Sequence, residues 1–351
     1  MQPTTALSRL LALDYLRGFF IVVIIIDHLW RWPNLFEYVS GRGELWASAA
    51  EGFVIISGLL IGYIRGYKNR HQPFTEVSKK LIKRGVLLYI WMYITTAVLV
   101  ALSWYLSYKG SLAYIPYNEY DWHSLLLGML RLDYVHSLTH FLYLYAIFLV
   151  ISPIVIILLR RSLAWVVAVL SLFVWFAGTQ LSIEWMQWQI LFFLPSIVGY
   201  YLEPLRHRYN SLPQYTRMVL AYGSIGITAT TIIFAASIIL PSAPGTYSES
   251  LFTREPLALA RILIAFVWFI GLFSLFELSQ RFIQRYFGWL LLPFGTKSLT
   301  AYILHTLPLM AFSFFFASFD TVWMNTLAAI ACILATWALI NIPHINRVIP
   351  R

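Results

Sequence analysis

The chain has 351 residues, of which 60% are hydrophobic, 17% aromatic and only 11% charged. Soluble domains usually carry about 25% charged residues, so a soluble globule of this length would lack polar surface. The formal net charge of +10 is compatible with nucleic-acid binding, but the mean hydropathy of +0.72 indicates that lipid is the solvent and argues against a soluble enzyme, a secreted domain or a disordered regulator.

Ten apolar stretches have lengths suited to crossing a bilayer as a helix, which takes about 20 residues. They cover roughly residues 11–30, 47–64, 85–106, 137–159, 163–181, 187–202, 218–240, 257–278, 292–317 and 321–341. The stretches are continuously apolar rather than alternating, which favours helices over the strands of a β-barrel. The sequence therefore predicts an all-α polytopic membrane protein of about ten transmembrane helices, with residues 1–351 as a single membrane-embedded domain.

The connections between these stretches carry positive charge mainly on one side of the membrane. With the N-terminus placed in the cytoplasm, seventeen Lys and Arg residues fall in cytoplasmic connections and five in outer ones. Because cytoplasmic connections are enriched in Lys and Arg, we expect both termini in the cytoplasm and the protein in the plasma (inner) membrane. The net charge then reflects topology and attraction to anionic membrane lipid, and no nucleic-acid partner is expected.

The first stretch carries a polar stripe formed by Asp14, Arg17 and His28. Arg17 and His28 are eleven residues apart, close to three helical turns, so they share a face and are separated by roughly 16 Å along the axis. Asp14 precedes Arg17 by three residues, a spacing that allows an ion pair. Ionisable groups at membrane depth cost several kcal/mol unless they are paired or wetted, so function is expected here first. Asp27 points about 100° away from His28 and is not expected to contact that ring.

The second stretch begins with small residues and carries Glu51 about one turn below the outer surface, the depth also expected for His28. A carboxylate and an imidazole at one depth on neighbouring helices can form a base and its orienting partner. The alternative is structural: Glu51 forms a buried ion pair with Arg261 of the eighth stretch, and Asp14 pairs with Arg17. Both interpretations fit the sequence.

These residues resemble motifs of the membrane-bound acyltransferase-3 superfamily. The pattern Leu13-Asp14-x-x-Arg17-Gly18 followed by His28, together with the run SAAEGFVIISG at 48–58, resembles the OpgC branch in particular. Residues 145–153 and 295–305 are similar to later segments of these proteins, and the count of ten helices agrees with the family's fold. Asp27 departs from the pattern, since related sequences often carry a neutral residue there.

The resemblance implies an integral membrane O-acyltransferase that moves an acyl group, with succinyl as a candidate, from cytoplasmic acyl-CoA to a hydroxyl of an extracytoplasmic glycan. It implies that His28 and Glu51 are catalytic and that Arg17 matches the family's arginine. We expect Arg17, with Asp14 and Lys297, to hold the donor, because arginine stays charged and binds phosphate bidentately.

Four further residues are expected on the substrate side: Arg261, His140, Tyr145 and His305. Arg261 and Tyr145 are candidates for stabilising the oxyanion. His140 either binds the acceptor or anchors a helix end at the interface, and His305 is included mainly through the resemblance. The sequence leaves open the acyl group, the acceptor, the oligomeric state, and the choice between direct transfer and an acyl-histidine intermediate.

Two other function classes compete with the transferase. The main alternative is a transporter or flippase of a glycan or lipid-linked substrate, in which the buried charges form the pathway. A structural or sensory membrane protein is the third possibility. No metal is expected, because the histidines are not spaced as ligands.

Overall fold

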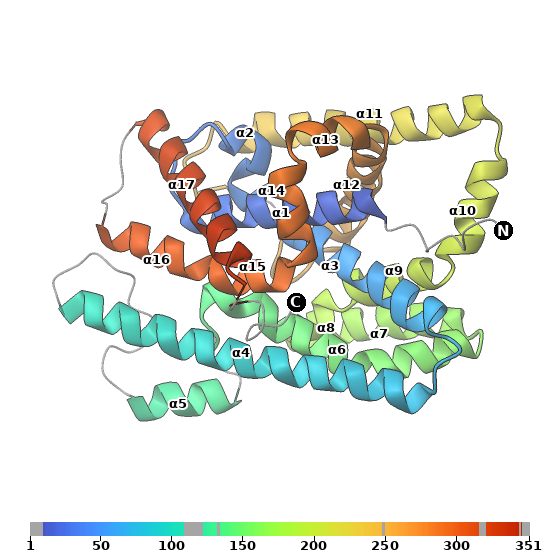
Figure 1. Ribbon diagram of the computed structural model, residues 1–351, viewed down its shortest axis with the longest axis horizontal. Helices are drawn as coiled ribbons and strands as arrows, with labels where there is room; N and C mark the ends of the chain where they lie inside the picture. The colour runs from blue at the N-terminus through green and yellow to red at the C-terminus, as the bar shows by residue number, and fades with distance from the viewer. Residues whose placement is uncertain are drawn as a thin grey trace.

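The computed structural model describes residues 10–108, 122–131, 134–247, 250–315, 321–343 and 345, and all regular structure in these residues is helical (Figure 1). The longer helices are α1 (Leu11–Leu29), α3 (Ala49–Leu60), α4 (Phe74–Tyr108), α6 (His140–Arg160), α7 (Ala164–Leu181), α9 (Ile190–Tyr200), α11 (Gln214–Ile239), α12 (Leu259–Leu278) and α17 (Val322–Asn341). The shorter ones are α2 (Glu37–Ser40), η1 (Gly41–Gly43), η2 (Ile61–Lys68), α5 (Trp122–Arg131), η3 (Ser137–Thr139), α8 (Glu184–Trp188), α10 (Leu202–Ser211), α13 (Gln280–Tyr286), α14 (Gly288–Thr296), α15 (Ser298–Leu304) and α16 (Thr306–Phe315).

Eight helical segments among the described residues are long and apolar enough to cross a membrane. This confirms the prediction of an all-helical, multi-pass membrane protein. The predicted spans at 11–30 and 187–202 correspond to helices of a different character. The apolar α1 carries three charged residues, Asp14, Arg17 and Asp27, and α9 is only 11 residues long. The count of ten spans and the cytoplasmic position of both termini therefore stay predictions.

Helices α7 and α11 expose large apolar side chains. Phe173 and Phe176 on α7 are 67% and 56% exposed, and Ile233 and Phe234 on α11 are 68% and 57% exposed. Soluble monomers rarely expose large contiguous apolar patches. These faces are suited to contact with lipid chains.

Helix α1 lies against α14, α3, α12 and α17, and its contact with α14 is made backbone to backbone. A Cβ atom on Gly18 would lie 2.1 Å from the carbonyl oxygen of Leu291, and one on Gly295 would lie 1.8 Å from that of Asp14. Small residues commonly permit such close approach between membrane helices. The packing fixes α1, and with it the polar stripe, against a close neighbour.

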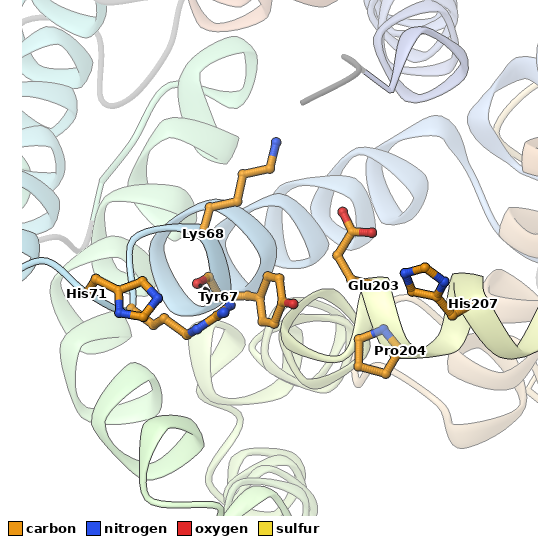
Figure 2. Close-up of a pocket in the computed structure, with 7 residues that line it drawn as sticks. Tyr67, Lys68, His71, Glu203, Pro204 and His207 are labelled. Carbon is orange, nitrogen blue, oxygen red and sulfur yellow. Dashed lines mark hydrogen bonds between the residues drawn. The ribbon is translucent and has the colours of Figure 1, made fainter. Parts of the chain in front are cut away.

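One end of the bundle, here called the basic end, contains the turn from η2 to α4 and the start of α10 (Figure 2). Arg160, at the end of α6, donates to the backbone carbonyls of Asn69, Gln72 and Arg65 at 2.7, 3.2 and 3.4 Å. These bonds satisfy carbonyl groups that a helix end leaves without intrahelical partners. They tie the η2–α4 turn to α6.

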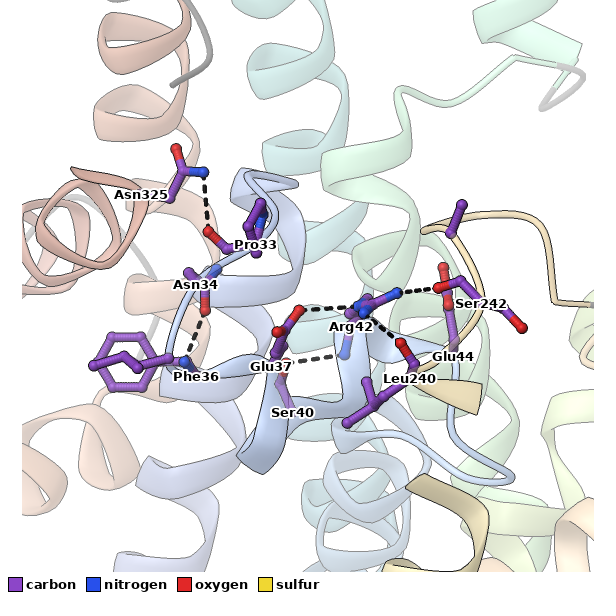
Figure 3. A network of polar contacts seen from close by, with 12 residues as sticks. Pro33, Asn34, Phe36, Glu37, Ser40, Arg42, Glu44, Leu240, Ser242 and Asn325 are labelled. Carbon is purple, nitrogen blue, oxygen red and sulfur yellow. Dashed lines mark hydrogen bonds and ion pairs between the residues drawn. The ribbon is translucent and has the colours of Figure 1, made fainter. Parts of the chain in front are cut away.

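At the other end of α1, the connection to α3 is an ordered polar network (Figure 3). The buried Arg42 donates from Nε to Glu37 at 3.1 Å, and from its terminal nitrogens to the carbonyls of Leu240 and Ser242 at 2.9 and 2.8 Å. Figure 3 also shows Asn325 of α17 bonded to the start of this connection. The network joins the ends of α1, α11 and α17, next to His28.

Candidate active site

His28 lies in the last turn of α1, beside His305, which separates α15 from α16. Their ring centres are 5.1 Å apart, and Nδ1 of His28 lies 2.8 Å from Nε2 of His305. His305 is completely buried, whereas His28 is partly exposed. The contact joins two residues that are 277 positions apart, which the sequence did not predict.

The partners of the two rings assign their protons. Nδ1 of His305 bonds to the backbone carbonyl oxygen of Tyr302. A carbonyl oxygen can only accept, so this nitrogen carries a proton, and Nε2 of the neutral His305 ring is an acceptor. His28 therefore donates from Nδ1, and its Nε2 keeps an unshared lone pair. A general base requires such a lone pair.

The predicted contact between Glu51 and His28 is wrong. One carboxylate oxygen of Glu51 accepts from Nε of Arg261 at 2.5 Å, and the other accepts from the amide and the hydroxyl of Ser48 at 2.8 and 2.5 Å. Ser48 and Glu51 form a capping box at the start of α3. The Ser48 hydroxyl accepts a bond from a backbone N–H of the first turn, and the Glu51 carboxylate accepts one from the backbone N–H of Ser48. The structural alternative is correct for the Glu51–Arg261 pair.

Arg261 is engaged in further hydrogen bonds. It also donates to the carbonyls of Leu45 and Phe252 at 3.3 and 3.2 Å. Glu51 is 0% and Arg261 4% exposed. The pair therefore joins α3, α12 and the segments that precede them. Arg261 also lines a pocket of about 250 Å³, and its Nη2 has no hydrogen-bond partner in the described part of the chain. The predicted contact of Arg261 with an oxyanion stays a prediction.

Arg17 lies between an aromatic ring and other ionisable groups. Its guanidinium carbon is 5.3 Å from the centre of the Phe53 ring, and Tyr145, Arg84 and Asp14 are ionisable groups close to it. Its Nε is buried and has no hydrogen-bond partner in the described part of the chain. The structure thus brings together Arg17, Tyr145 and Asp14, around a donor able to bind a ligand.

Aromatic rings form a continuous line from Arg17 to His28. The centre of the Phe53 ring is 5.0 Å from that of Phe141, Phe141 is 5.4 Å from Tyr302, and Tyr302 is 6.2 Å from His28. The three intervening rings come from α3, α6 and α15. All three rings are buried, so Arg17 and His28 are connected through a packed and largely apolar part of the core.

The sequence matches the family described as OpgC protein over residues 9–345. The chain belongs to the OpgC family. This confirms the resemblance, which was strongest in the first two helices, over nearly the whole chain. Membership indicates a glucan-modifying, acyltransferase-like membrane protein with a transferase role. Comparison with curated proteins and with solved structures found no match.

Lys297, predicted to bind the donor of this OpgC-family protein, contacts the end of another helix. Its Nζ donates to the carbonyl of Ile340 at 2.9 Å and to the side chain of Asn341 at 3.1 Å. A cation at a helix C-terminus stabilises that helix. Donor binding by Lys297 stays a prediction, beside this structural contact with α17.

His140 lies at the start of α6, with its Nε2 2.5 Å from Oε2 of Glu184 at the start of α8. Its ring makes an edge contact with Tyr143 at 5.8 Å. The pair is partly exposed, and its part in binding the acceptor stays a prediction. Glu184 was not singled out from the sequence, because its partner is 44 positions away.

Two residues near His28 were not predicted as site residues from the sequence. Apart from His305, Arg254 and His136 are ionisable groups close to His28. Arg254 is exposed, its guanidinium carbon lies 5.4 Å from the centre of the Trp188 ring, and it lines a pocket of about 250 Å³. Burial lowers the pKa of His136 to about 4, so that ring is neutral at neutral pH.

The sequence offered only one indication that Arg254 and His136 could lie near a site. Both are in connections just before predicted spans. Their approach to His28 depends on how the helices pack. Within the described ranges, no three His, Cys, Asp or Glu side chains are grouped as metal ligands would be.

Proposed function

We propose that this protein is a transmembrane O-acyltransferase that transfers an acyl group from cytoplasmic acyl-CoA to a hydroxyl of an extracytoplasmic glycan. The observation that carries the proposal is the partly exposed His28, whose Nε2 lone pair is left open by the bond to His305. A lone pair of this kind is what a general base requires.

The donor enters from the basic end, which the distribution of Lys and Arg assigns to the cytoplasm. Arg17 binds a polar group of the donor through its open Nε donor, next to Tyr145. The pantetheine arm then follows the rings of Phe53, Phe141 and Tyr302. Arg17 and His28 are separated by roughly 16 Å along α1, so an extended arm carries the thioester to His28.

His28 acts as the general base of the transfer. Its Nε2 takes the proton of the acceptor hydroxyl while the hydroxyl oxygen bonds to the thioester carbonyl carbon. The bond from that carbon to sulfur then breaks, and the departing CoA thiolate takes the proton from Nε2. While His28 is protonated, its bond to His305 is charge-assisted and therefore stronger.

The acyl group proposed is succinyl, and the acceptor a glucan, in keeping with the family. Succinyl carries a carboxylate that an acetyl group lacks. The exposed Arg254 has a charge that acts on His28, and its contact with Trp188 holds this cation near the site. Arg254 would attract the free carboxylate and so favour succinyl. We place this activity in the inner membrane.

The test uses the full chain in proteoliposomes, labelled succinyl-CoA on the donor side and glucan on the other, with label in the glucan as the readout. His28→Ala should lower transfer by about 10²–10⁴-fold. Asp27→Asn is the matched control, since Asp27 adjoins His28 in α1 but faces Ser40 and Gly43. It should retain transfer.

Arg17→Ala should raise the KM for the donor more than the KM for the acceptor. An unchanged donor KM would contradict the role given to Arg17. Glucan movement across the bilayer with no transfer of label would contradict the proposed acyltransferase and support the transporter or flippase alternative.

A further inference from the structure

A pocket of about 450 Å³ lies at the basic end, between η2 with its following turn and the start of α10. Figure 2 shows its lining residues on two sides, Tyr67, Lys68 and His71 on one and Glu203, Pro204 and His207 on the other. Arg70 completes the lining. The volume falls in the range of small-molecule sites.

Tyrosine rings hold the cations of this pocket. Nζ of Lys68 lies 4.5 Å from the centre of the Tyr63 ring, and the guanidinium carbon of Arg70 lies 4.2 Å from that of Tyr67. Within the described part of the chain, neither cation is in an ion pair with a carboxylate. Two positioned and unneutralised charges are suited to bind an anion.

The carboxylate that lines the pocket does not neutralise these cations. Oε1 of Glu203 accepts a hydrogen bond from the hydroxyl of Tyr63 at 2.6 Å. Its other oxygen can accept an N–H or O–H group of a ligand. The pocket therefore combines anion-binding groups, a hydrogen-bond acceptor and aromatic surface.

The backbone of η2 creates this arrangement. It is a π-helix from Ile61 to Lys68, whose hydrogen bonds join residues five apart, and Lys68 accordingly lies over the ring of Tyr63. Tyr63 and Tyr67, which are four residues apart, stack at 6.5 Å and 9°. In an α-helix, five residues would rotate Lys68 about 140° away from Tyr63. π-helical segments are rare and often occur at functional sites.

We propose that this pocket binds the phosphorylated adenosine end of the acyl-CoA donor. Lys68 and Arg70 bind phosphate oxygens, the stacked Tyr67 and Arg70 offer a flat surface for the base, and Glu203 accepts a hydrogen bond from the nucleoside. This inference rests on the proposed function, which supplies a donor of this class.

Polar groups lie between the pocket and the candidate active site. Arg65 belongs to the same π-helix, and Arg84 and Tyr145 are ionisable groups close to it. The same two groups are close to Arg17, where the aromatic line to His28 begins. A donor bound with its nucleotide in the pocket thus has polar contacts along the way to Arg17.

The test is equilibrium binding of adenosine 3′,5′-bisphosphate to the full chain in nanodiscs of neutral lipid, measured by calorimetry. The double variant Lys68→Gln/Arg70→Gln should bind about tenfold or more weakly, because each charge-assisted bond alone is worth that factor. Lys79→Gln/Lys83→Gln is the charge-matched control, since Lys79 and Lys83 are exposed near the start of α4 but do not line the pocket. Equal binding by the double variant and the control would overturn the proposal.

A second set of measurements separates a nucleotide from other phosphates. Tyr67→Leu should weaken nucleotide binding and Tyr67→Phe should preserve it, while pyrophosphate should bind weakly to all three proteins. If pyrophosphate binds as tightly as the nucleotide, or if nanodiscs containing anionic phospholipid abolish nucleotide binding, the pocket belongs to a free phosphate or a lipid headgroup, and the nucleotide assignment is wrong.

His28→Ala should bind the nucleotide as tightly as the parent protein. If nucleotide binding depends on Lys68 and Arg70 but the protein transfers no acyl group, the proposed function is contradicted. The assignment of the pocket as a nucleotide site then still holds. Acyl transfer whose donor KM is unaffected by the double variant would contradict the pocket alone.

Discussion

Two pairs of ionisable side chains join distant helices in this protein, and they differ in what they leave unbonded. In the Glu51–Arg261 pair, both carboxylate oxygens are bonded and both residues are buried. In the His28–His305 pair, one hydrogen bond connects two neutral rings, and Nε2 of the partly exposed His28 stays open. The comparison shows that buried polar pairs in one helical bundle differ in which hydrogen-bonding atoms they leave unused. The ion pair leaves a buried donor, Nη2 of Arg261, without a partner among the described residues, whereas the histidine pair leaves an acceptor on the partly exposed His28.

The largest effect is expected from breaking the buried Glu51–Arg261 ion pair. Glu51→Ala leaves the buried Arg261 charge without its partner and should cost about 3–5 kcal/mol of folding stability. Denaturant unfolding in micelles measures this loss. Glu51→Ala/Arg261→Met, which removes both charges, should recover much of it. A Glu51→Ala protein that folds as stably as the parent but transfers no acyl group would instead make Glu51 catalytic.

Breaking the histidine pair should affect catalysis rather than folding. His305→Phe removes the acceptor for Nδ1 of His28, so kcat should fall, by less than the about 10²–10⁴-fold expected for loss of the base itself. His305→Gln, whose amide oxygen can accept the same bond, should restore part of the rate. The donor KM should stay constant while the pH profile of kcat/KM shifts in His305→Phe. Unaltered kcat and pH profile in that variant would remove His305 from the mechanism as a positioning residue.

Arg254 sharpens the comparison on the substrate side. Arg254→Gln should lower kcat/KM for succinyl-CoA by about tenfold or more, because a charge-assisted hydrogen bond to the carboxylate is lost, and leave acetyl-CoA unaffected. The ratio of the two kcat/KM values is the readout. An equal decrease for both donors would show that Arg254 supports the site in general and does not select the acyl group.

The smallest effect is expected at Lys297, a cation that is hydrogen-bonded to the Ile340 carbonyl and the Asn341 side chain. Lys297→Met removes the bonds to the end of α17 and should cost about 0.3–1 kcal/mol of stability, with the donor KM unchanged. Thermal unfolding and donor titration measure the two quantities. A clear rise in donor KM would place Lys297 in the donor site after all.

Part of this site could be predicted from local spacing. Arg17 and His28 share a face of one helix because eleven residues make nearly three turns, and the structure places them at the two ends of one aromatic line. Ser48 and Glu51 also have the spacing of a capping box. The sequence analysis did not use that pattern, which would have predicted a role for Glu51 at the start of α3. The capping box accounts for one of its oxygens.

The partners of these residues could not be predicted in the same way. His305 reaches His28 across 277 positions, and Arg261 reaches Glu51 across 210. Spacing along the chain does not show which of several polar groups at the same depth is the partner of a given residue. Likewise, the π-helical turn that aligns Lys68 with Tyr63 leaves the hydropathy of the stretch unchanged.

Hydropathy and helical periodicity alone determined that this chain is a helical membrane protein with a polar stripe on its first helix, because both follow from the transfer of side chains to lipid and from the fixed rotation per residue. Only the packing of α1 against α3, α12, α14 and α15 decided which polar groups neutralise each other and which stay open. That choice depends on contacts within a few ångströms between segments far apart in the chain, where close backbone contact such as that at Gly18 sets the distances.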